Sequence, residues 1–301
     1  MSNKAICNAL QTAYLRRYTL TEGKENGLKV IELGNNELRV LINESKALDI
    51  MQVWHKGVNM SFVSKNGFTA REIAFGRRFE GGMVYTCGLD AIGGCEGHEP
   101  HGMLHNTPAR VLEVSQEADT LRVKATIEST ALFGENLCVE RTITLTGNQL
   151  RLEDKLRNNG TKEENYSLLY HINFGYPMLD EGTKIIADVA EVVPVTDHAA
   201  EKLPQRTVFS APVDNEEESC YYMQNLGDTV SVVNEKLGRK VTLRYSKDTL
   251  PCLVQWSSPA SGDYALGIEP ATSRLGGEIC YKQLQPEQVA DFFAELTFDS
   301  N

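Results

Sequence analysis

The chain has 301 residues, of which 41% are hydrophobic and 24% are charged, and its formal net charge is −11. The length fits one large β sandwich or barrel, and no run of about eighteen apolar residues could cross a membrane. The negative charge disfavours nucleic acids and acidic membranes, because both attract clustered Lys and Arg. We therefore expect a neutral or weakly charged small molecule as the partner.

The N-terminal residues carry no apolar segment typical of a secretory signal. Seven cysteines are scattered along the chain without a Cys-x-x-Cys pair, which fits a reducing cytoplasm better than a disulfide or zinc scaffold. Helical periodicity is present only near Asn8–Tyr18, so residues 1–25 are interpreted as an N-terminal extension that could be helical.

Alternation of apolar and polar residues dominates the rest of the chain and predicts strands. Leu121, Val123, Ala125 and Ile127 share one face, for example, and 137–145 repeats the pattern. Further strands are predicted at 28–33, 38–42, 150–156, 230–234, 241–245, 252–257, 264–269 and 290–298. Without a linker or a repeat, these segments predict a single all-β domain over 1–301, a large antiparallel sandwich or barrel with few short helices.

Residues 75–109 interrupt the strand pattern with glycines, histidines and acidic residues. A loop this long inside a domain is usually functional, although a glycine-rich surface loop is the alternative interpretation. His98, His101 and His105, together with Glu96 and Glu99, could in principle ligate a metal. Their spacing matches no metal motif, so we predict neither a metal nor another cofactor.

A second informative segment is 167–175. As a strand it would place Leu168, Tyr170, Ile172 and Phe174 on one face, with His171 and Asn173 on the other. A His and an Asn on one face suit hydrogen bonding to a polyol, and a purely structural histidine is the rival interpretation.

The third segment, 264–270, would direct Leu266 and Ile268 inward and line its other face with small residues that end at Glu269. This arrangement suits a general base beside a bound ring, and an exposed glutamate at the end of a strand is the alternative. The nearby Gln255 and Trp256 are residue types common in sugar sites, although a tryptophan more often belongs to the core.

Six motifs in this order resemble the galactose mutarotase-like superfamily, in particular a divergent branch related to aldose 1-epimerases. The motifs are the strand with Asp49 leading to Lys56-Gly57, Thr86-Cys87-Gly88-Leu89-Asp90, His101-Gly102 with Asn106-Thr107-Pro108-Ala109, 132–137, Leu169–Gly175 and Gly267–Pro270. The resemblance covers about Leu48 to Leu296. It implies a β-supersandwich with an open sugar cleft and the interconversion of sugar anomers without a cofactor.

The resemblance also implies roles for individual residues. Glu269 is similar to the general base of the family, His171 to the general acid and His101 to a second active-site histidine, while Arg77 and, more weakly, Gln255 are similar to substrate-binding residues. Arg78 beside Arg77 leaves that alignment open. We expect Glu269 and His171 to face each other across one open pocket, too far apart for a direct hydrogen bond, with His101 and Arg77 at its border.

Three other functions remain open at this stage. A non-catalytic sugar-binding or regulatory protein could share the fold. A glycoside hydrolase or lyase would need a second carboxylate or a Tyr base, and no convincing carboxylate partner for Glu269 is visible. A metal-dependent sugar isomerase would use the loop histidines. The sequence specifies neither the sugar nor the oligomeric state.

Overall fold

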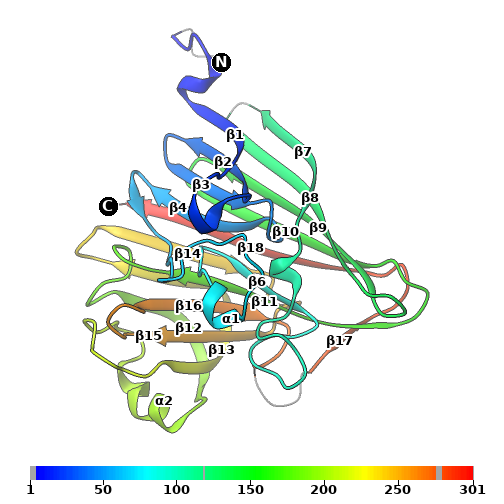
Figure 1. Ribbon diagram of the computed structural model, residues 1–301. Helices are drawn as coiled ribbons and strands as arrows, with labels where there is room; N and C mark the ends of the chain where they lie inside the picture. Colours follow the sequence, from blue (N-terminus) through cyan, green and yellow to red (C-terminus); the bar gives the residue numbers. More distant parts are fainter. Residues whose placement is uncertain (1–4, 118, 276–279, 301) are drawn as a thin grey trace.

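The computed structural model describes residues 5–117, 119–275 and 280–300, and it consists mainly of two antiparallel sheets (Figure 1). The five-stranded sheet has the order β1 (Ala13–Thr19), β2 (Lys29–Asn35), β3 (Leu38–Asn43), β4 (Asp49–His55) and β5 (Val58–Asn59). The predicted large antiparallel β sandwich with few helices is confirmed.

The larger sheet has thirteen strands. Its main path is β17 (Lys282–Leu284), β11 (Glu164–Phe174), β16 (Ala265–Ala271), β15 (Cys252–Ser258), β13 (Ser219–Asn234), β14 (Arg239–Tyr245), β18 (Val289–Ser300), β10 (Gln149–Asn158), β9 (Asn136–Thr146), β8 (Thr120–Thr130) and β7 (Arg110–Glu117). In addition, β12 (Lys184–Pro194) pairs with β13, and β6 (Tyr85–Leu89) pairs with β11.

The helices are short: α1 spans Phe75–Arg78, α2 spans Asp197–Lys202, and 3-10 turns lie at Ala9–Gln11, Gly23–Glu25, Leu104–Asn106 and Leu203–Gln205. The helix predicted near Asn8–Tyr18 is wrong. Only one 3-10 turn forms there, and Ala13–Thr19 pairs with β2 as an edge strand. Pairing along a whole strand outweighs a weak helical pattern. Within the described residues, no helix has the length and apolar character needed to cross a bilayer.

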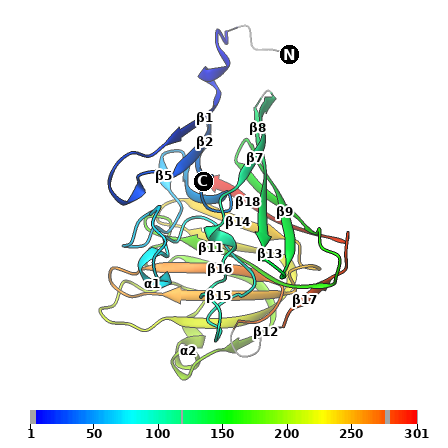
Figure 2. The ribbon, with the colours of Figure 1, turned by 45° about the vertical axis from the view of Figure 1, so that its right-hand side comes forward.

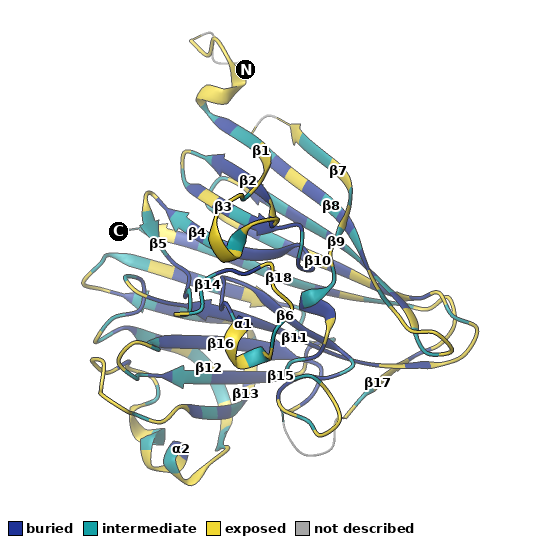
Figure 3. Ribbon diagram, in the orientation of Figure 1, coloured by how far each residue is buried: buried dark blue, intermediate teal, exposed yellow. Residues whose placement is uncertain are grey.

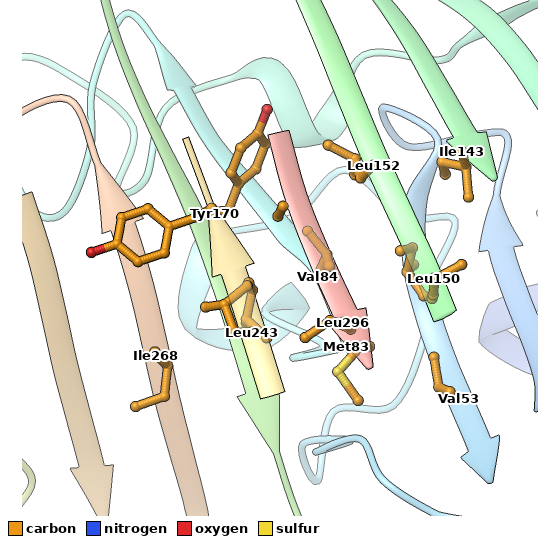
Figure 4. Packing of buried hydrophobic residues seen from close by; sticks show 14 of the residues in the cluster. Val53, Met83, Val84, Ile143, Leu150, Leu152, Tyr170, Leu243, Ile268 and Leu296 are labelled. Carbon is orange, nitrogen blue, oxygen red and sulfur yellow. The ribbon is translucent and has the colours of Figure 1, made fainter. Parts of the chain in front are cut away.

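The core lies between the two sheets and follows from the alternation in the sequence. Leu121, Val123, Ala125 and Ile127 of β8 are at most 1% exposed, whereas the residues between them are more exposed. Figure 3 shows the buried residues concentrated along the strands. In Figure 4, Val53 of the small sheet and Met83 lie in the same cluster as Leu150 and Leu296 of the large sheet.

A buried ionic network joins the two sheets. The guanidinium of Arg141 in β9 donates two hydrogen bonds to Asp154 in β10, at 2.8 and 2.6 Å, and one to Asp49 in β4, at 2.6 Å. Tyr170 Oη donates to Asp154 at 2.7 Å, and His105 Nδ1 lies 2.6 Å from Asp49. Every carboxylate oxygen of this network is therefore hydrogen-bonded.

Strand β11 differs from the other strands because nearly all of its residues are buried, on both faces. Its residues 169–174 pair with β16 on one edge, and its residues 167–171 pair with β6 on the other. Figure 2 shows β11, β16 and β15 side by side in the middle of the molecule. The segment that carries His171 is thus held in the interior of the large sheet.

Candidate active site

Strand register brings the two predicted acid–base residues together. Leu169 pairs with Ala271 and Ile172 with Ile268, so His171 of β11 lies directly opposite Glu269 of β16. The same row continues through Val254 and Tyr222 on one side and through Tyr85 on the other. Residues nearly a hundred positions apart in the chain thus meet on one face of the sheet.

The distance between these two side chains contradicts our expectation. His171 Nε2 lies 3.2 Å from Glu269 Oε1, which leaves no room for a sugar ring between them. The contact lacks hydrogen-bond geometry, because Glu269 Oε1 has no hydrogen-bond partner. The expected open pocket is also wrong for the pair itself, since His171 is 4% exposed and Glu269 is 1% exposed.

Gly267 makes the close contact possible. A Cβ atom at this position would lie 2.5 Å from Glu269 Oε1, 3.0 Å from His171 Cε1 and 3.2 Å from Trp256 Cε3. The space that the sequence predicted beside Glu269 exists, but the catalytic candidates themselves fill it. Any larger residue would push at least one of them away.

Burial favours the uncharged forms of both the Glu269 carboxyl and the His171 imidazole. It raises the pKa of the Glu269 carboxyl well above its ordinary value, and the nearby Glu218 carboxylate adds to the rise. It lowers the pKa of His171 well below its ordinary value, and His101 contributes to the decrease. The favoured state therefore has the shared proton on Glu269 and a neutral imidazole at His171.

His101 reaches the same site from the long loop. Its ring centroid lies 5.5 Å from that of His171, and its Nδ1 lies 3.1 Å from Cys87 Sγ. Burial lowers the pKa of His101 to about 4 and raises the pKa of the Cys87 thiol well above its ordinary value. A neutral thiol can donate to Nδ1, which leaves the imidazole proton on Nε2 as a donor.

The backbone also fixes the position of His101. The residue has a φ of 63°, which a histidine adopts only infrequently. Its N–H donates to Gly93 O at 2.9 Å, and its carbonyl accepts from Gly88 N at 3.0 Å. These two hydrogen bonds hold the imidazole beside β11 in spite of the unfavourable conformation.

Aromatic rings enclose the pair. The centroid of Phe79 lies 5.5 Å from that of His171, and Trp256 lies 5.3 Å from His171. Trp256 is partly exposed, and its Nε1 donates to Glu218 at 2.8 Å. An aromatic face beside an acid–base pair suits the apolar face of a sugar ring.

Asn173 lies beside His171 on this face, as predicted, but its amide donor is already engaged. Its Nδ2 donates to Gly82 O at 3.1 Å and to His171 O at 2.9 Å. Its Oδ1 is buried without a partner. Asn173 therefore fixes the backbone of the site, and a substrate contact could come only from Oδ1.

The prediction for Gln255 is wrong. Gln255 pairs with Ile268, so its side chain lies on the opposite face of the sheet from Glu269. There it contacts Arg206, accepting from Nη1 at 3.1 Å and donating to the carbonyl at 2.8 Å. The residue on the site face is its neighbour Trp256, which pairs with Gly267.

Arg77 lies in α1, between Phe75 and Phe79, whose rings contact His101 and His171. Its side chain is exposed and has no ion pair among the described residues. Arg78 is instead the buried arginine, and it donates to Glu99 at 2.9 Å and to Ile73 O at 2.6 Å. Of these two arginines, Arg77 is the one free to contact a ligand.

The loop histidines have three different environments. His98 Nδ1 lies 3.7 Å from Asp90, His101 contacts Cys87, and His105 is buried against Asp49. In the part of the chain that the structure describes, no three His, Cys, Asp or Glu side chains are grouped to hold a metal ion. The loop thus contributes one histidine to the candidate site.

Sequence reasoning assigned no role to Phe79, Tyr85 and Cys87, and it left Trp256 open between a sugar site and the core. Phe79 directly follows α1, and the other side chains come from β6 and β15, which meet only in the folded sheet. The alternation of Gln255 and Trp256 showed that they face opposite ways. Only the register with β16 shows which of them faces Glu269.

Comparisons with known structures support the fold. A candidate aldose 1-epimerase from Klebsiella pneumoniae superposes with a TM-score of 0.87 at 24% identity, covering 95% of this chain and 83% of the other. A galactose mutarotase-like protein from Clostridium acetobutylicum gives a TM-score of 0.72 at 14% identity, covering 97% and 100%. The predicted galactose mutarotase-like fold is thereby confirmed.

Sequence comparisons place the chain in a family whose description names no activity. No curated protein matches the chain. One family matches residues 25–285, which include every residue of the site described above. The chain therefore belongs to the family described as a domain of unknown function, DUF4432.

Proposed function

We propose that this protein is an aldose 1-epimerase, which interconverts the α and β anomers of a reducing sugar or sugar derivative. The observation that carries the proposal is the set of buried polar atoms without partners at one place. They are Glu269 Oε1, His171 Nδ1 and Asn173 Oδ1, from the paired strands β11 and β16. Each buried atom of this kind costs about 1–3 kcal/mol, so such a group calls for an explanation. A polyhydroxylated ring supplies both donors and acceptors.

The pair can perform both proton transfers of the reaction. One member accepts the proton of the anomeric hydroxyl while the other donates a proton to the ring oxygen, and the ring opens to the aldehyde. Rotation about the bond between the first two carbons exposes the other carbonyl face, and the ring closes with the roles exchanged. One shared proton is sufficient, whichever residue holds it at the start.

In the protonation state that burial favours, the acid and base roles are the reverse of those that the family resemblance implies. In that state His171 is the base for the anomeric hydroxyl and protonated Glu269 is the acid. The other distribution, with ionised Glu269 and protonated His171, has the same total charge and gives the roles implied by the resemblance. His101 contributes a donor beside the pair, and Trp256 offers its ring to the sugar.

Substitution of Glu269 tests the proposal directly. Exchange NMR on a panel of neutral and anionic reducing sugars should show at least one whose anomers interconvert faster than in buffer. Glu269→Gln keeps the shape of the side chain and removes its titration, so turnover should fall by about a hundredfold or more while sugar binding persists. Glu235→Gln, at an exposed residue paired with Lys184, is the matched control and should keep full turnover.

Two outcomes would contradict an epimerase. If no sugar in the panel exchanges faster than in buffer although some bind, the protein is a carbohydrate-binding protein, and the 3.2 Å pair has a structural role. If Glu269→Gln turns over sugar at the native rate, the pair does not carry the proton transfers.

A further inference from the structure

A small cavity lies on the face of the large sheet opposite the candidate active site. Its volume is about 160 Å³. It lies where α2 and the following segment cover the ends of β13 and β15, near the bottom of Figure 1. Ser219, Tyr221 and Ser257 contribute from the strands, and they share a face with Gln255 because Tyr221 pairs with Gln255 and Ser219 with Ser257. The two sites thus lie on opposite faces of one sheet.

Arg206 supplies a positive charge to this cavity. Its side chain is only partly exposed, and it has no carboxylate partner among the described residues. Gln255, which is completely buried, accepts a hydrogen bond from the guanidinium of Arg206 and donates one to the carbonyl oxygen of Arg206. Burial lowers the pKa of Arg206 from its ordinary value. Holding a half-buried cation without a counter-ion costs free energy, and an anion that binds beside it would offset this cost.

The remaining charges of the wall cancel. Lys202 and Glu216 form an ion pair, so the lining residues carry a net charge of one positive unit from Arg206 in a chain whose net charge is −11. The other walls are largely apolar: Val208, Phe209, Val213 and Pro259. Ser257 Oγ accepts from Gln255 Nε2 at 3.2 Å, and its own hydroxyl proton has no acceptor in the described part of the chain. The cavity therefore combines one cation, a hydroxyl donor and apolar walls.

We propose that this cavity binds a small organic carboxylate with a ring-sized apolar part. The carboxylate pairs with the guanidinium of Arg206 and accepts from the Ser257 hydroxyl, while the ring contacts the apolar wall. The volume agrees with this size, because a cavity of about 150 Å³ holds a benzene molecule. Gln255 is the positioning residue for Arg206. This site is independent of the proposed epimerase activity.

Titration calorimetry with benzoate tests the proposal, with benzamide as the neutral ligand of the same shape. Benzoate should bind the full chain saturably, and benzamide should bind at least tenfold more weakly. Arg206→Gln should weaken benzoate binding at least tenfold, while Arg122→Gln, an exposed arginine of β8, should leave it unchanged. Glu269→Gln should also leave it unchanged, which separates this cavity from the candidate active site.

Two further variants protect the test against misfolding. Val208 is 49% exposed on the cavity wall, so Val208→Asp should fold and should abolish benzoate binding by charge repulsion. Gln255→Met frees Arg206 and should weaken binding several-fold without changing the selectivity for benzoate over benzamide. Absence of saturable benzoate binding, equal binding of benzamide, or native affinity in both Arg206→Gln and Val208→Asp would overturn the proposal.

Discussion

Two neighbouring residues of β11 belong to buried polar clusters with opposite properties. Tyr170 points into the core, where its hydroxyl donates a hydrogen bond to Asp154. Asp154 in turn accepts from Arg141, which also donates to Asp49. His171 points to the other face, where neither its Nδ1 nor Glu269 Oε1 has a hydrogen-bond partner. Both clusters are buried, yet only in the first, the satisfied cluster, is every carboxylate oxygen hydrogen-bonded.

Under the proposed function, the contrast corresponds to a structural role for the first cluster and a catalytic role for the second. Burial alone would raise the pKa of Asp49, but the hydrogen bond from His105 and the charge of Arg141 outweigh it and lower the pKa. At Glu269 no such compensation exists, and the pKa rises. A carboxylate that stabilises the fold has its hydrogen bonds satisfied by neighbouring residues, whereas a group that acts on a ligand keeps free hydrogen-bonding capacity.

The largest expected effect comes from breaking the satisfied cluster. Arg141→Met removes the completely buried guanidinium and leaves Asp49 and Asp154 without their shared cation. We expect a loss of about 3–5 kcal/mol in the free energy of unfolding, measured by urea denaturation. Arg151→Met breaks surface ion pairs instead and should cost less than about 1 kcal/mol. Equal losses in the two variants would show that the buried network is not special.

The next effect comes from disturbing the unsatisfied cluster without changing its ionisable groups. Gly267→Ala inserts a methyl group 2.5 Å from Glu269 Oε1 and should displace the pair. Because displacements of about 1 Å can cost about a hundredfold in rate, we expect turnover to fall by about ten- to a hundredfold. Gly227→Ala is the control, since its nearest neighbour would be 3.9 Å away. Native turnover in Gly267→Ala would argue against catalysis by this pair.

How far the sequence predicts the molecule depends on whether the deciding contacts are local. Strands such as β8 were predictable, because one buried face imposes a period of two. The strand at Ala13–Thr19 was not, because β2 decides its conformation. Glu269, His171 and His101 were chosen as candidates from residue type and motif. The 3.2 Å contact and the face of Gln255 depend on the register between β15, β16 and β11, which no local pattern contains.

A more moderate effect is expected from pH. If the active form of the pair holds one proton, activity falls in acid when His171 also becomes protonated, and in alkali when Glu269 loses its proton. Burial lowers the pKa of His171 below its ordinary value of 6.5, which moves the fall in acid to lower pH. It raises the pKa of Glu269 above its ordinary value of 4.5, which moves the fall in alkali to higher pH. The rate, corrected for solvent catalysis, should therefore show a plateau around neutrality with a fall on each side. A rate that is unchanged from acid to alkali would contradict these roles.

The smallest expected effect is that of a chelator, which should leave turnover unchanged. The proposed proton transfers use only the carboxyl group of Glu269 and the imidazole of His171. They need no metal ion held by the loop histidines. His105 contacts Asp49 and His98 lies beside Asp90, so these two histidines have partners of their own, different from that of His101. Turnover measured before and after dialysis against EDTA should agree within error. A large loss that a single divalent ion restores would instead indicate a metal-assisted reaction.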